Sequence, residues 1–116
     1  MFQKNMAVSL LLDFYGDILS EHKRTIMEMY YDEDMSLAEI AEQVGISRQA
    51  VRDVIKKSES ELSELESTLG LVKKFDKLKK DLEDIKNELT SLSECSSDSD
   101  KAKISQVIRK IDELEI

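Results

Sequence analysis

Apolar residues recur with the period of an α-helix along most of this chain, and the most informative pattern runs from Ser36 to Lys57. A first helix is predicted to begin at Ser36. Together with Glu39, Ser36 forms an S-x-x-E capping box, in which each side chain accepts the other residue's backbone N–H. The apolar face of this helix comprises Leu37, Ile40, Ala41 and Val44. Gly45 supplies the left-handed residue with which a helix commonly ends, and Ile46 fills the turn.

A second helix is predicted to begin after Ser47, whose hydroxyl can cap it. Its inward-facing residues are Val51, Val54 and Ile55. Its outward-facing residues are Arg48, Gln49, Arg52, Asp53 and Lys56. Two capped helices joined by a glycine turn, with the small Ala41 where they cross, are typical of a DNA-binding helix-turn-helix. A plain helical hairpin with solvated arginines would show the same pattern, so the function needs separate support.

Two further helices are predicted before this motif. The first covers residues 3–15 and ends at Gly16, with an apolar stripe made of Met6, Leu10, Leu11 and Phe14. The second begins at Ser20 and runs to about Tyr31, with a stripe made of Ile26, Met27, Met29 and Tyr30. We interpret both stripes as core positions, because nothing near them indicates a cofactor.

Beyond the motif, its second helix is expected to continue to Leu69, where Gly70 breaks or kinks it. Apolar residues then follow a heptad spacing of three and four: Phe75, Leu78, Leu82, Ile85, Leu89 and Leu92. The serine-rich, acidic segment 91–100 is predicted to be a flexible turn. A final helix is predicted at about residues 100–114, with Ile104, Val107, Ile108, Ile111 and Leu114 on one side.

These elements divide the chain into a helix-turn-helix domain, residues 1–69, and a helical extension, residues 70–116. An antiparallel hairpin within the extension would cover only part of the heptad stripe, because its second arm is shorter than its first. The uncovered part favours self-association, most simply as a two-fold homodimer. The alternative is a closed hairpin that buries the stripe within one chain.

Composition supports an all-α fold, because proline is absent and only three glycines and 5% aromatic residues occur in 116 residues. The formal net charge of −8 is unusual for a protein that binds phosphate backbones. Residues 1–70 hold seven Lys and Arg against fourteen Asp and Glu, whereas residues 71–116 hold ten against eleven. DNA binding would therefore depend on a local cluster, which comprises Arg48, Arg52, Lys56 and Lys57. The acidity leaves an RNA or protein partner as a second possibility.

Other chemistry is sparse. With Cys95 and His22 as the single cysteine and histidine, no intramolecular disulfide and no metal site of recognised spacing is expected. The sequence has no glycine-rich phosphate loop and no nucleophile–base constellation, so we expect no enzyme activity and no cofactor. No apolar run is long enough to span a bilayer and no signal-peptide pattern is present, so a cytoplasmic protein is expected.

From about Leu19 to Leu65 the chain resembles region four of bacterial sigma factors, the domain that binds the promoter −35 element. The resemblance is carried by S-L-A-E-I-A-E-Q-V-G-I-S-R and the helix that follows it. More closely, DFYGDILSEHKRTIMEMYYDEDMSLAEIA and VGISRQAVRDVIKKSE are similar to the YlxM-like family (UPF0122), which are small helix-turn-helix proteins of low-GC Gram-positive bacteria. This second resemblance covers roughly residues 6–69.

These resemblances imply an all-α, sigma region-four-like helix-turn-helix domain with long C-terminal helices, in a regulatory protein that binds DNA or RNA. Ser47 and Arg48 would contact phosphate, while Gln49, Arg52 and Asp53 would face base edges. Arg52 suits guanine and Gln49 suits adenine. The candidate nucleic-acid-binding residues are thus Ser47, Arg48, Gln49, Arg52, Asp53, Lys56 and Lys57.

The YlxM-like resemblance further implies an accessory protein that is linked, through the neighbourhood of its gene, to the targeting GTPases of the signal recognition particle pathway. The alternative is an interaction module that does not bind DNA. Such a module would dock a targeting GTPase or an RNA polymerase subunit.

Overall fold

The computed structural model describes residues 4–114, and these residues form helices without any strand. In chain order the elements are α1 (Met6–Tyr15), the 3₁₀ helix η1 (Gly16–Ile18), α2 (Glu21–Tyr31), α3 (Leu37–Val44), α4 (Arg48–Leu69), α5 (Leu71–Glu94) and α6 (Asp98–Asp112). The all-α prediction is confirmed. The chain separates into a first compact unit that ends at Val72 and a second that begins at Lys73.

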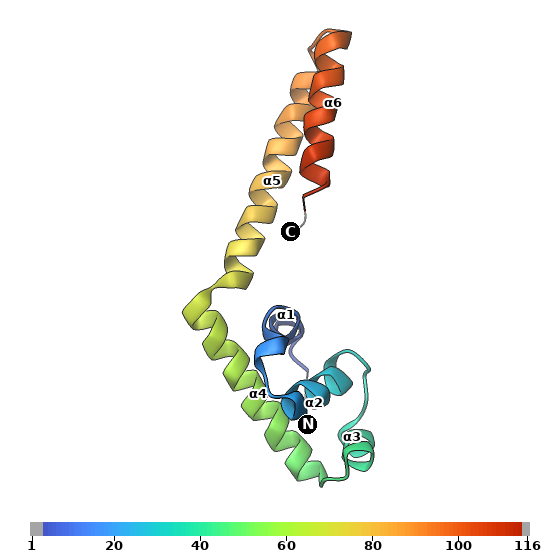
Figure 1. Ribbon diagram of the computed structural model, residues 1–116, viewed down its shortest axis with the longest axis vertical. Coiled ribbons are helices and arrows are strands. Elements are labelled where there is room, and N and C mark those ends of the chain that lie inside the picture. Colours follow the sequence, from blue (N-terminus) through green and yellow to red (C-terminus); the bar gives the residue numbers. More distant parts are fainter. Residues whose placement is uncertain (1–3, 115–116) are drawn as a thin grey trace. The chain divides into compact units, whose positions relative to one another are not determined.

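In the first unit α1, α2 and α3 all pack against α4 (Figure 1). The side chains at the centre of this core are fully buried: Ile26 and Met27 from α2, Ile40 from α3, and Val51, Ile55 and Leu62 from α4. Burying one such side chain stabilises the fold by roughly 1.5–3 kcal/mol. The long helix α4 is therefore the scaffold that positions the other three.

The predicted stripe of α2 is confirmed, since its four residues are all buried. The predicted stripe of α1 is wrong in part. Met6 and Leu10 are exposed, while the buried residues of α1 are Val8, Leu12 and Tyr15. Apolar residues occupy almost every position of this short helix, so spacing alone did not identify its buried face. The predicted start at Gln3 lies outside the described residues. Gly16 does follow the helix, but in a right-handed conformation that opens η1.

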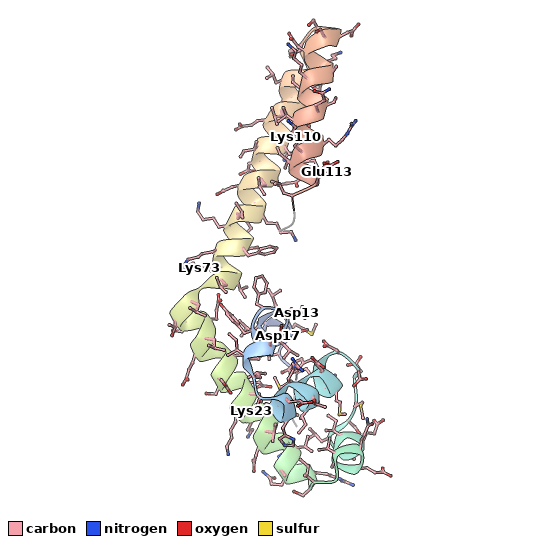
Figure 2. All side chains as sticks on the ribbon, in the orientation of Figure 1. Asp13, Asp17, Lys23, Lys73, Lys110 and Glu113 are labelled. Carbon is pink, nitrogen blue, oxygen red and sulfur yellow. The ribbon has the colours of Figure 1, made fainter. Side chains whose placement is uncertain are left out.

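Three carboxylates on α4 hold the preceding helices by polar contacts. The pairs are Tyr15 Oη donating to Glu66 at 2.6 Å, Lys23 Nζ to Glu61 at 2.9 Å, and Tyr31 Oη to Glu59 at 2.7 Å. Figure 2 labels Lys23 on α2. Burial, and then the bond to Glu59, raises the pKa of Tyr31. Some of the acidic side chains of residues 1–70 thus form polar contacts that hold the helices of the first unit together.

Tyr15 also determines how α4 ends and α5 begins. Gly70 takes a left-handed conformation, with φ at 63°, and closes α4. The backbone N–H of Leu71 then donates to Tyr15 Oη, and that of Val72 to Glu66, both at 3.0 Å. These bonds satisfy two of the N–H groups that the start of a helix leaves open. The predicted break at Gly70 is confirmed.

The second unit contains the hairpin of α5 and α6, whose two helices run antiparallel side by side (Figure 1). Lys86 Nζ on α5 bonds Asp112 Oδ1 on α6 at 2.6 Å, and this contact raises the pKa of Lys86. The predicted flexible segment 91–100 is much shorter in the structure, because α5 continues to Glu94. Ser97 then caps α6 by accepting the N–H of Asp100.

Candidate nucleic-acid interface

The helix-turn-helix is built as its local sequence predicts. Ser36 Oγ accepts the N–H of Glu39, and the Glu39 carboxylate accepts the N–H of Ser36, both at 3.1 Å. The latter bond lowers the pKa of Glu39. Gly45 is left-handed with φ at 82°, a conformation that costs glycine little. Ser47 Oγ caps α4 by accepting the N–H of Ala50 at 3.0 Å.

The outward face of α4 carries the predicted residues in two adjacent rows. At 3.6 residues per turn, Arg48, Arg52 and Lys56 fall in one row and Gln49, Asp53 and Lys57 in the next. All of them are exposed except Arg52, which is partly buried. Gln49 Nε2 donates to Asp53 Oδ1 at 3.0 Å, so the amide of Gln49 is held along the helix. The capping residue Ser47 is exposed at the start of both rows.

The other basic side chains of the first unit are paired within the fold. Lys4 pairs with Asp34, Lys23 with Glu61, and Arg24 with Asp17 and Glu28. In contrast, Arg48, Lys56 and Lys57 form no ion pair with any of the residues 4–114. The positive charge that remains available in this acidic unit is therefore concentrated on the N-terminal half of α4.

A groove separates the first turns of α3 and α4. Its volume is about 380 Å³, and it is lined by Ser36, Leu37, Ala38, Arg48, Gln49 and Arg52. Helix N-termini present unpaired backbone N–H groups and a partial positive charge, which favour phosphate. Because the capping box uses the N–H groups of Ser36 and Glu39, those of Leu37 and Ala38 remain for a ligand. The groove thus combines two arginines with two helix N-termini.

Comparison with known proteins agrees with this geometry. Residues 2–113 match the model of the UPF0122 family, which is described as "Putative helix-turn-helix protein, YlxM / p13 like". This chain belongs to the UPF0122 family. Its UPF0122 relatives include a protein of Thermoanaerobacter pseudethanolicus that is 43% identical over 92% of each chain. Another, from Geobacillus kaustophilus, is 36% identical over 99% of this chain and 100% of its own length.

Membership of UPF0122 confirms the YlxM-like resemblance and extends it, since the match continues through α5 and α6. It also assigns the chain to a helix-turn-helix family and not to an enzyme family. Cys95 is exposed, and the described part of the chain contains no cluster of residues that could hold a metal ion. None of the described helices is long and apolar enough to cross a membrane.

Of the predicted residues, the structure brings Arg48, Gln49 and Arg52 together in the lining of the groove. Ser47 caps α4 just before them, and Asp53 bonds Gln49. Lys56 and Lys57 extend the rows one to two turns further along α4. Sequence reasoning did not include the first turn of α3, which contributes Leu37 and Ala38 to the groove. The available indication was the capping box, which marks a helix N-terminus, but only the crossing of the two helices places that terminus beside Arg48.

Proposed function

We propose that this UPF0122 protein is a regulatory nucleic-acid-binding protein that inserts the N-terminal half of α4 into a DNA major groove. The observation that carries the proposal is the concentration of available positive charge on this helix, in a unit whose other basic residues are paired. Arg48 and the first turn of α3 would contact phosphate. Gln49 and Arg52, supported by Asp53, would contact base edges.

Charge determines what kind of binding to expect. The net charge of −8 opposes long-range attraction to DNA. Binding should therefore be local, sensitive to salt, and dependent on Arg48, Lys56 and Lys57 together. Structured RNA presents the same phosphates to the same residues, so RNA belongs in the same binding experiment. The resemblance to sigma region four favours DNA.

The experiment is fluorescence anisotropy at low salt with labelled duplex DNA and with a structured RNA. Arg48→Ala should weaken binding. It should also reduce the slope of the logarithm of the binding constant against the logarithm of salt concentration by roughly one, as expected when a phosphate contact is lost. Arg52→Ala should weaken binding by about 5- to 100-fold if it contacts a guanine. Arg109→Ala is the matched control, because Arg109 is an exposed arginine on α6. If the Arg48→Ala, Arg52→Ala double variant binds both ligands as tightly as the unaltered protein, the proposal fails.

We further propose that the protein is cytoplasmic, acts as a homodimer through α5 and α6, and takes part in the signal recognition particle pathway. The pathway is supported only by the family resemblance. The homodimer is supported by the exposed apolar side chains on α5 and α6. A tagged chain that copurifies from cells with components of the signal recognition particle would support a role in this pathway. Copurification that is unaffected by Arg48→Ala would separate that role from nucleic-acid binding.

The second candidate function is an interaction module that docks a targeting GTPase or an RNA polymerase subunit without binding nucleic acid. The acidic excess of residues 1–70 favours it. A partner captured through residues 71–116 and retained after nuclease treatment would support this candidate.

A further inference from the structure

The hairpin of α5 and α6 leaves a set of large apolar side chains about half exposed. On α5 these are Leu78, Ile85 and Leu92, on α6 Val107, and just after α6 Leu114, with exposed fractions of 44–56%. Their neighbours in the heptad stripe, such as Leu82 and Leu89, are partly buried. Each helix of the hairpin therefore has one covered apolar row and one open row.

The two open rows lie on the same face of the hairpin. Ile85 and Leu92 each follow a covered leucine by three residues, and on α6 Val107 follows the buried Ile104 by three. Viewed along one direction, two antiparallel helices turn in opposite senses. Residues that follow the contact between the helices by the same number of positions therefore lie on the same side of the hairpin. The Lys86–Asp112 ion pair lies on the other side, because Lys86 follows Leu82 by four residues. We call the side with the open rows the apolar face.

Acidic residues of α5 and basic residues of α6 border this apolar face. One residue before each covered leucine of α5 stands an acid, Asp81 or Glu88, and the equivalent positions of α6 are Lys103 and Lys110. Asp81 pairs with Lys77 at 3.1 Å. Glu88, Lys103 and Lys110 form no ion pair within the described residues 4–114. Figure 2 labels Lys110 on α6.

We infer that the apolar face binds the same face of a second copy of this chain, with α5 of each copy lying against α6 of the other. This inference rests on the homodimer in the proposed function and specifies how it is built. A two-fold axis parallel to the helices keeps every residue at its own level. The Lys86–Asp112 contact places residues 88 and 110 at one level, since both pairs of numbers have the same sum. Glu88 therefore meets Lys110 of the second copy.

The charges also disfavour the competing arrangement. If the two-fold axis crossed the helices, α5 would lie against α5 and α6 against α6. The acidic edge would then face an acidic edge and the basic edge a basic one. Like charges at such edge positions disfavour a pairing, as they do in coiled coils. Self-complementarity of a patch under a two-fold axis is the condition for a closed dimer.

The experiment measures self-association by sedimentation velocity at low salt, without nucleic acid. Glu88→Lys and Lys110→Glu should each weaken the dimer by roughly tenfold, because each creates two like-charge contacts. An equimolar mixture of the two variants should form a heterodimer in preference to either homodimer, because both of its contacts become attractive. Glu94→Lys is the matched control. Glu94 lies nine residues after Ile85, which is half a turn away from the apolar face.

A second variant tests the apolar contact itself. Ile85→Asp should weaken the dimer by on the order of a hundredfold, because it puts two charges into the interface. The hairpin should stay helical by circular dichroism, since the Ile85 side chain is 46% exposed in the single chain. A dimer in which Glu88→Lys strengthens association, or in which the mixed variants show no preference, overturns the arrangement and leaves the homodimer standing. A protein that stays monomeric at high concentration overturns both, while the anisotropy of Arg48→Ala still tests nucleic-acid binding.

Discussion

The helices α4 and α5 have similar lengths, 22 and 24 residues, and similar apolar periodicity, yet they are buried to very different extents. Three helices pack on α4, and Val51, Ile55 and Leu62 are fully buried. No residue of α5 is buried. Apolar periodicity therefore shows that a helix has an apolar face, but it does not show which segment, if any, packs on that face.

This difference gives the largest expected effect. Ile55→Ala should destabilise the first unit by about 2–5 kcal/mol, because it leaves a cavity in a packed core. Ile85→Ala should cost less than about 1 kcal/mol in the dilute, monomeric protein, because Ile85 is already half exposed. Chemical denaturation measures both. All three tyrosines precede Val72, so tyrosine fluorescence follows the first unit alone and reports Ile55→Ala, while the loss of helix by circular dichroism also follows the hairpin and reports Ile85→Ala. Equal losses for the two variants would contradict the contrast between α4 and α5.

The tyrosine contacts to α4 sharpen the comparison. Tyr31→Phe should destabilise the first unit by about 1 kcal/mol, since it removes the hydrogen bond to Glu59. Tyr15→Phe should cost more, because it also leaves the N–H of Leu71 without its acceptor. Ile18→Ala is the control for general effects of substitution near α1, because Ile18 is exposed. Denaturation midpoints in which Tyr15→Phe loses no more than Tyr31→Phe would contradict the double role of Tyr15.

The same tyrosines predict a dependence on pH. Burial, and then the bond to Glu66, raises the pKa of Tyr15, and burial raises that of Tyr31. A raised pKa in the folded state means that the stabilisation is fully present below the ordinary tyrosine pKa of about 10 and is lost as the pH rises beyond it. Denaturation midpoints should therefore fall above a pH of about 10, and less steeply for Tyr31→Phe. Tyrosinate absorbance that titrates at the ordinary pKa in the folded protein would contradict this.

The smallest expected effect is a gain. Ser58 on α4 is fully buried, and its hydroxyl has no hydrogen-bond partner among the described residues. Ser58→Ala should stabilise the first unit by about 1 kcal/mol, because it removes a buried unpaired polar group. Ser60→Ala controls for helix propensity, since Ser60 is exposed on the same helix. A larger gain from Ser60→Ala than from Ser58→Ala would contradict this account of Ser58.

Much of the fold was predictable because it depends on neighbours in sequence. The capping box at Ser36, the left-handed Gly45 and Gly70, and the cap at Ser47 follow from local hydrogen bonds and backbone sterics. The outward direction of Arg48 follows from the inward direction of Val51, since both are set by the helical period. These features determined the helix-turn-helix and its candidate residues.

Other features depend on residues that are distant in sequence, and only the tertiary structure decided them. The buried face of α1 depends on its packing against α4, where Tyr15 bonds Glu66, 51 residues away. The groove exists because α3 and α4 cross, which brings Ala38 beside Arg48. The division of the heptad stripe into covered and open rows required the length and register of α6. Local sequence fixes hydrogen bonds within a helix, whereas the choice among several apolar faces depends on what else in the chain can pack against them.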